Sequence, residues 1–236
     1  MLKIENFEVM GWEHAIRGMR NPMNSWEKSD SGYCVQDLSR DCNNCVHKHT
    51  NYPTCRCGGF DIGPNDYALM KKLRNAGTDH RKFMRMITVY LDITAPLYWW
   101  KEFDTYKVGT VVNSCSTMHK IHEKEFTIED FSCEHLKDSF GESHDCFSQL
   151  DILYDVIIML NVCREDYLQS KSKDDWDQMI QLLPSSYNQK RTVMLNCEVL
   201  ANIYKSRKDH KLDEWHTFCH WVDELPYSEL ITGYEE

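Results

Sequence analysis

The chain has 236 residues, a formal net charge of −10 and eleven cysteines. A chain of this length can bury a core without disulfides, so we expect one large domain or one domain with a small insertion. The negative charge excludes a general electrostatic grip on nucleic acid, because such binding depends on clustered lysine and arginine. It leaves room for a local basic pocket.

No stretch has the roughly 18 apolar residues that a membrane-spanning helix needs. The long apolar window from Leu150 to Val162 carries Asp151 and Asp155. The N-terminus, MLKIENFEVMGW, has acidic residues where a secretory signal has a basic region followed by an apolar one. We therefore expect a soluble cytoplasmic protein with reduced thiols, which fits an odd number of cysteines better than a disulfide framework does.

The predicted elements begin with a strand over residues 2–9, where apolar and polar positions alternate imperfectly. A helix over residues 10–20 follows, since apolar residues recur there at helical spacing: Trp12, Ala15, Ile16 and Met19. This helix should end near Pro22, because the residue before a proline avoids the α region.

Residues 21–63 form a cysteine-rich segment that is unlike a packed core, being rich in Asn, Ser, Asp and Gly. Cys42 and Cys45 are followed by Cys55 and Cys57, and thiolates two to four residues apart can reach one tetrahedral zinc ion. The second pair has a single intervening residue, where zinc patterns usually have two or more. Two interpretations stand: a zinc-binding insertion, or a surface insertion with incidental reduced thiols.

Two helices are expected between this segment and the middle of the chain. The turn at Gly63 and Pro64 leads into the first, with Asn65 or Asp66 as its cap. Gly77 is placed to end it with a left-handed backbone. Thr78 or Asp79 can cap a second, short helix that runs through Arg85.

The β-branched run ITVYLDIT, residues 87–94, is the strongest predicted strand. Ala95 and Pro96 then open a helix, since proline is tolerated in the first helical turn. The helix carries an aromatic stripe at Leu97, Trp100 and Phe103, which we interpret as core rather than as a stacking platform.

The second half of the chain is mostly helical. Residues 125–141 are expected to form loop and short turns, and residues 185–194 a loop with a short strand. The longest helix spans residues 145–170 with a wide buried face, and further helices span 174–183, 196–208 and 212–225, the last stopped by Pro226. The predicted fold class is α+β: a single helix-rich domain over residues 1–236 with a small sheet and the cysteine-rich insertion.

Common catalytic motifs are absent from the sequence. It contains no GxGxxG, Walker A, GxSxG or HExxH pattern, so dinucleotide-fingerprint, P-loop, hydrolase and zincin chemistries lack local support. Cys115 and His119 are four residues apart and could share a helical face as a thiolate pair. A structural cysteine is the commoner alternative.

Two blocks of sequence follow an order found in a known family. The first has Gly77 and His80 before a short helix, then the strand, then Asn113 and Ser116. The second has Leu183 and Pro184, then Thr192, Asn196, Arg207 and the run Asp213 to His216. In this order and spacing the chain resembles the flavin-dependent thymidylate synthases over residues 66–226. That family methylates dUMP with FAD, NADPH and methylenetetrahydrofolate, as a homotetramer.

The resemblance implies roles for individual residues. It places Asn113, Ser116 and Arg207 at a pyrimidine nucleotide, with Arg207 also as the catalytic residue. It places His80, Tyr106, Lys107 and Asn196 at FAD.

The chain also departs from the family pattern. Thr105, Tyr106 and Lys107 stand where the family has Arg-His-Arg, and Glu198 stands where it has Arg. Each charge-assisted hydrogen bond lost costs about 1.5–3 kcal/mol, so the specificity is expected to shift. We therefore expect a flavin- and nucleotide-binding protein that methylates dUMP or modifies a related pyrimidine nucleotide. The alternative is a non-catalytic binding or interaction protein on the same scaffold.

Overall fold

The computed structural model describes residues 1–33, 60–138 and 148–233. The predicted zinc ligands Cys42, Cys45, Cys55 and Cys57 lie outside these residues, so the zinc site stays a prediction. In the described ranges, no group of three or more His, Cys, Asp or Glu side chains is arranged to hold a metal ion. The helices in those ranges also include none that is long and apolar enough to cross a membrane.

The chain divides into two compact units, each assembled from several segments. We call residues 1–3, 93–105 and 113–191 the α4 unit, and residues 4–92, 106–112 and 192–236 the α6 unit, after a helix that each contains. The expectation of a single domain stays a prediction.

A four-stranded sheet has the strand order β1-β4-β6-β5. The strands are β1 (Lys3–Met10), β4 (Thr88–Pro96), β5 (Thr110–Ser114) and β6 (Asn188–Asn196). The predicted strands at 2–9 and 87–94 are confirmed, whereas β5 was not anticipated and β6 is longer than the short strand expected within residues 185–194. In β4 alternate residues are fully buried, Val89, Leu91 and Ile93 among them, as expected for a strand with one face on the core.

The less buried side of the sheet in the α6 unit carries a polar ladder across three strands. Asp92 of β4 accepts hydrogen bonds from Asn6 of β1 (3.0 Å) and from Thr192 of β6 (2.7 Å). Such cross-strand pairs help to fix the strand register, because a slip by one residue would move Asp92 to the buried face.

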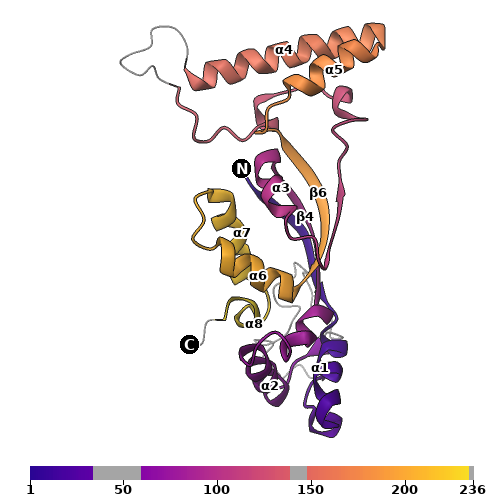
Figure 1. The fold of residues 1–236 in the computed structure, drawn as a ribbon, viewed down its shortest axis with the longest axis vertical. Coiled ribbons are helices and arrows are strands. Elements are labelled where there is room, and N and C mark those ends of the chain that lie inside the picture. Colours follow the sequence, from indigo (N-terminus) through magenta and orange to yellow (C-terminus); the bar gives the residue numbers. More distant parts are fainter. Residues whose placement is uncertain (34–59, 139–147, 234–236) are drawn as a thin grey trace, which may run out of the picture. The chain divides into compact units, whose positions relative to one another are not determined.

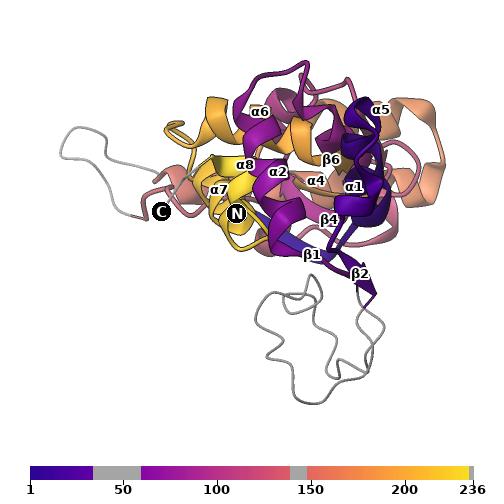
Figure 2. The ribbon, with the colours of Figure 1, turned by 90° about the horizontal axis from the view of Figure 1, so that it is seen from below.

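The α6 unit is otherwise helical. Its helices pack against one another in pairs that include α2 with α8, which lie side by side (Figure 2), and α6 with α7 and α8. They are α1 (Trp12–Arg20), α2 (Pro64–Asn75), α6 (Cys197–Arg207), α7 (Asp213–Asp223) and α8 (Glu229–Thr232). The 3-10 helices η1 (Asn21–Met23), η2 (Trp26–Lys28) and η4 (Arg81–Met86) and a small hairpin of β2 (Gly32–Tyr33) with β3 (Phe60–Asp61) complete it.

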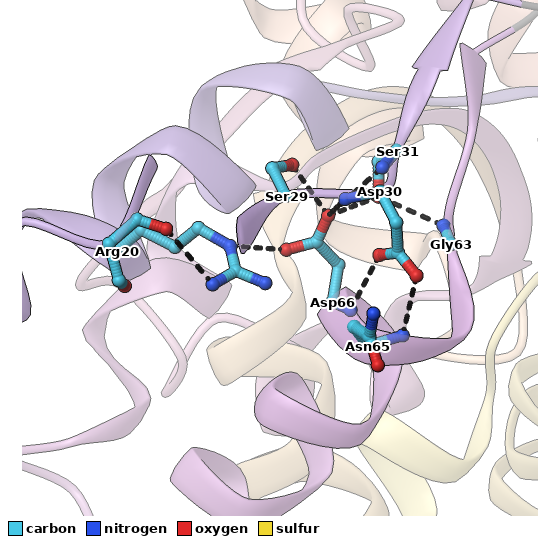
Figure 3. Close-up of polar contacts among 8 residues, drawn as sticks. Arg20, Ser29, Asp30, Ser31, Gly63, Asn65 and Asp66 are labelled. Atoms are coloured by element: carbon cyan, nitrogen blue, oxygen red, sulfur yellow. Dashed lines mark hydrogen bonds and ion pairs between the residues drawn. The ribbon is translucent and has the colours of Figure 1, made fainter. Parts of the chain in front are cut away.

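The start of α2 is capped from a distant part of the chain, contrary to the prediction of a cap at Asn65 or Asp66. Asp30 accepts the backbone N–H groups of Asn65 (2.8 Å) and Asp66 (3.0 Å), as Figure 3 shows. The predicted caps at Thr78 or Asp79 are also wrong, because the residue before η4 is His80 and no side chain caps that helix. Gly77 has the expected positive φ, at 107°.

Asp66 is fully buried and forms the centre of a polar cluster at the base of the hairpin (Figure 3). Its carboxylate accepts hydrogen bonds from Arg20 Nε (2.6 Å), Ser29 Oγ (2.6 Å) and Ser31 Oγ (2.7 Å). The backbone N–H groups of Asp30 and Ser31, both at 3.1 Å, complete the set. Burial alone would raise the pKa of Asp66, but these hydrogen bonds and the charge of Arg20 outweigh it and lower the pKa.

The α4 unit contains a separate apolar cluster. Its helices are α3 (Leu97–Phe103), α4 (Gln149–Ser170) and α5 (Lys173–Leu182), with 3-10 helices η5 (Ile121–Glu123) and η6 (Ile128–Asp130). Helices α4 and α5 pack side by side (Figure 1). The cluster that they enclose consists of Ile121, Phe126, Phe131, Leu153, Ile157, Leu160 and Met179.

Two predictions about helices in this unit can now be compared with the structure. The aromatic members of the predicted stripe of α3 are core, since Trp100 and Phe103 are each 1% exposed, whereas Leu97 is only partly buried. The wide buried face expected for α4 is wrong, because only a narrow stripe faces the cluster. Tyr154, Ile158 and Val162, which were expected inside, are between 44% and 59% exposed.

Candidate functional site

The predicted site residues fall in both units. Asn113 and Ser116 belong to the α4 unit. The α6 unit holds five others, which are His80, Tyr106, Lys107, Asn196 and Arg207. Because each unit is described by itself, a common cleft around Asn113, Ser116, Asn196 and Arg207 stays a prediction. The geometry below concerns each unit separately.

Asn196 is the N-cap of α6 and lies against a loop. Its Oδ1 accepts the backbone N–H groups of Glu198 and Val199, both at 3.1 Å, which is the usual reason for Asn at this position. Gly109 has a φ of +78°, and a Cβ added there would come within 2.7 Å of Asn196 Nδ2. The loop therefore approaches the start of α6 closely enough that only glycine fits.

Glu198 lies in the first turn of α6 and pairs with two arginines of η4. Its Oε1 accepts from Arg81 Nε at 3.2 Å, and its Oε2 accepts from Arg85 Nε. The Glu198 side chain is 12% exposed. Burial alone would raise its pKa, but hydrogen bonds from Arg85 and Arg81 outweigh it, so the pKa is lowered. The negative charge that departs from the family pattern is thus balanced within the chain by two arginines of η4.

Replacing Glu198 with alanine should destabilise the α6 unit. The change leaves two guanidinium groups side by side without their shared carboxylate, and we expect a loss of about 1–3 kcal/mol in the free energy of unfolding. Urea denaturation at neutral pH measures it. Glu123→Ala is the matched control, because it removes the partner of an exposed ion pair with Lys120 and should leave stability unchanged. Equal losses of unfolding free energy in the two variants would show that the pairing of Glu198 with Arg81 and Arg85 stabilises the protein no more than an exposed ion pair does.

Arg207, at the last position of α6, is held by two aromatic residues. Its Nε donates to the hydroxyl of Tyr106 at 2.9 Å. The guanidinium carbon lies 4.9 Å from the centre of the Trp215 ring and 5.6 Å from that of Tyr106. These are cation–π distances, and a cation at the C-terminus of a helix is favoured by the helix dipole.

The other site residues of the α6 unit are more exposed. His80 immediately precedes Arg81 at the start of η4, and its backbone N–H donates to Gly77. Lys107 is exposed and lies in the same loop as Tyr106 and Gly109. Three elements therefore contact residues of α6: η4 through Arg81 and Arg85, this loop through Tyr106 and Gly109, and α7 through Trp215.

In the α4 unit, Asn113 and Ser116 flank the end of β5. Asn113 is exposed in the strand, and the hydroxyl of Ser116 accepts the backbone N–H groups of Met118 (3.2 Å) and His119 (2.9 Å). These bonds shape a turn, so the suggestion that Cys115 and His119 share a helical face is wrong. The structure therefore does not support Cys115 and His119 as a thiolate pair on one helix.

Arg191 of β6 is a mostly buried cation that the sequence did not single out. Its guanidinium carbon lies 4.2 Å from the centre of the Trp100 ring, and its Nη1 donates to Asp104 at 2.9 Å. A third bond runs from its Nε to Gln189 at 2.9 Å. Burial lowers its pKa. With aromatic, acidic and amide partners in place, we interpret Arg191 as a residue that stabilises the sheet.

Two buried thiols of the α6 unit are poor nucleophiles. Burial raises the pKa of Cys197 to about 12 and that of Cys219 to about 11. Both are therefore protonated at neutral pH, and the thiolate is the reactive form. The chemistry available around α6 is hydrogen bonding and positive charge from Arg207.

Structural comparison shows what this arrangement is similar to. Thymidylate synthase X from Helicobacter pylori, in a structure with FAD and dUMP, matches with a TM-score of 0.64 and 14% identity, covering 99% of this chain and 98% of that one. A second structure of this flavin-dependent thymidylate synthase, also with FAD and dUMP, matches with a TM-score of 0.62 and 15% identity, covering 100% and 99%. The chain has the fold of the flavin-dependent thymidylate synthases.

A third structure, of a different protein, is also similar to the chain. A UMP/dUMP methylase from Streptomyces cacaoi, bound with 5-Br dUMP, matches with a TM-score of 0.57 and 13% identity, covering 99% of this chain and 96% of that one. No protein-family model and no curated protein sequence matches the chain. The resemblance seen in the sequence, and the α+β fold class predicted with it, are confirmed by the fold.

Proposed function

We propose that this protein binds FAD and a pyrimidine nucleotide, dUMP in the first instance, and methylates the nucleotide. The observation that carries the proposal is the shared fold over nearly the whole chain, with solved structures that contain FAD and dUMP. The anchored guanidinium of Arg207 supports it, because a planar fork suits a phosphate or the edge of a uracil ring.

In this proposal, the nucleotide is bound by Arg207 together with Asn113 and Ser116. Arg207 supplies charge-assisted hydrogen bonds, and the two neutral side chains supply weaker ones. Arg207 is also the group that would stabilise negative charge on the nucleotide during the reaction. We expect a homotetramer, as in the family that the sequence resembles.

The flavin site that the resemblance implies consists of His80, Tyr106, Lys107 and Asn196. Asn196 caps α6 through Oδ1, so its Nδ2 is the atom we assign to the cofactor. When bound, FAD would supply the hydride, and the chain supplies binding, orientation and electrostatics.

A non-catalytic role on the same scaffold is the second candidate, and one observation favours it. Glu198 already occupies Arg81 and Arg85, so these two arginines carry a counterion from within the chain. A site with less uncompensated positive charge binds a dianionic nucleotide or a pyrophosphate less tightly. Under this candidate the protein binds neither ligand, or binds the nucleotide without flavin chemistry.

Ligand binding tests the proposal. The purified protein is expected to retain flavin, seen as visible absorbance and fluorescence of the released cofactor, and dUMP should raise its unfolding temperature. A ligand present at about 100 times its dissociation constant adds about 2.7 kcal/mol to the free energy of unfolding. Thymidine and CMP serve as comparison ligands, and methyl transfer is then assayed with methylenetetrahydrofolate and NADPH. Absence of both flavin and a dUMP response would reject the proposal. Binding without turnover would favour the second candidate.

A further inference from the structure

We propose that Tyr106 is a positioning residue that acts on the nucleotide through Arg207. The inference rests on the proposed function, because it deepens the role of Arg207 at the nucleotide. It differs from the direct flavin contact that the resemblance implies for Tyr106. The contacts within the α6 unit are its basis.

The hydrogen bond from Arg207 Nε to the Tyr106 hydroxyl fixes one edge of the guanidinium. A guanidinium is planar, so a bond at Nε and a ring beside its face together restrict both its tilt and its rotation. Trp215 supplies the ring, at 4.9 Å from the guanidinium carbon. The long and flexible arginine side chain therefore loses conformational entropy before any ligand binds. Ligand binding then does not have to order this side chain, which favours higher affinity.

The two aromatic residues are themselves fixed. Trp215 is fully buried in α7, and its ring packs edge-on against Phe218, with centroids 5.8 Å apart, and against His210 at 6.3 Å. The Tyr106 ring meets the Trp215 ring at 6.3 Å in the same manner. Because the Tyr106 ring packs against Trp215, its hydroxyl is held in place and can fix the position of the Arg207 guanidinium.

The alternative is that Tyr106 touches the ligand directly. The two roles differ in energetics, because a residue that acts only through Arg207 has nothing left to contribute once Arg207 is removed. A residue with its own ligand contact still contributes. A double-mutant cycle separates the two cases.

The cycle uses the full chain, with Tyr106→Phe, Arg207→Ala, the double variant and calorimetric titration of dUMP. Tyr106→Phe should weaken dUMP binding about tenfold, the size expected for one hydrogen bond. The same change in the Arg207→Ala background should have no further effect on dUMP affinity.

A second measurement uses the ligand-free protein. The Nε–H proton of Arg207 should exchange faster with solvent in Tyr106→Phe than in the unmodified protein. Tyr67→Phe is the matched control, since its hydroxyl bonds Glu229 at 2.8 Å elsewhere in the unit, and it should leave dUMP affinity unchanged.

Each outcome decides one point. Unchanged dUMP affinity in Tyr106→Phe, with a clear loss in Arg207→Ala, would overturn the positioning role. Additive losses in the double variant would overturn it too and would indicate direct contact. Failure of the unmodified protein to bind dUMP would instead reject the proposed function on which the inference rests.

Discussion

Replacing Asp66 with alanine is expected to lower the free energy of unfolding by about 3–5 kcal/mol, because it leaves the buried Arg20 without its counterion. The Arg20 side chain is 5% exposed and that of Asp66 is fully buried, so water cannot replace the lost carboxylate. Ser29, Ser31 and two backbone N–H groups lose their acceptor as well. Such a change is a large part of the stability of a typical domain.

Urea denaturation of the variant and the unmodified protein gives the difference directly. Asp177→Ala is a suitable control, since Asp177 pairs with the exposed Lys173 on the surface of α5 and its loss should have little effect. If the alanine variant does not fold, Asp66→Asn keeps the shape, removes the charge and gives a smaller loss. A cost near zero in both variants would mean that the cluster of Figure 3 does not support the fold.

The same residue should make stability depend on pH. The pKa of Asp66 is lowered in the folded protein, so its charged form stabilises the fold at pH values above the unfolded pKa of about 4. This contribution is lost as the pH falls through the lower folded pKa. Asp66→Asn should therefore show a shallower decline in stability below pH 4 than the unmodified protein.

The second large effect is expected from Arg207. Arg207→Ala should weaken dUMP binding by about 1.5–3 kcal/mol, the range for hydrogen bonds to charged groups, which corresponds to about 10- to 150-fold. Arg207→Lys keeps the charge but loses the planar fork and the Tyr106 bond, and should recover only part of the affinity. Calorimetric titration of dUMP measures both.

Two controls make this result interpretable. Lys211→Ala removes an exposed cation that follows Arg207 closely in the sequence, and it should leave dUMP affinity unchanged. Thermal unfolding without ligand should show that Arg207→Ala remains folded, because Arg207 is only partly buried. Equal affinity of Arg207→Ala and the unmodified protein would remove Arg207 from the site.

Much of the fold followed from local pattern, and the exceptions have identifiable causes. The β-branched run became β4 because its side chains suit a half-buried strand. Strand β6 was expected only as a short strand because its buried side carries Gln189 and Arg191, where a strand pattern expects apolar residues. Their polar atoms are satisfied by partners far away in sequence, such as Cys115 and Asp104. Local pattern cannot supply those partners.

The cap of α2 failed for the same reason, since Asp30 reaches it from 35 residues upstream of Asn65. The exposed apolar residues of α4 show the converse, because periodicity gives the apolar face of a helix but not how much of it the neighbouring elements cover. At the candidate site, the sequence named Arg207 and Tyr106 separately. Their hydrogen bond needed the fold, as did the pairing of Glu198 with Arg81 and Arg85.

The central claim is that Arg207, at the C-terminal end of α6 and anchored by Tyr106, binds a pyrimidine nucleotide. Hydrogen exchange of the full chain with and without dUMP tests it most directly, because protection of backbone amides reports where a ligand acts. Slower exchange in residues 106–109 and at the Arg207 end of α6 is the predicted result. Exchange that dUMP leaves unchanged in both segments would contradict the claim.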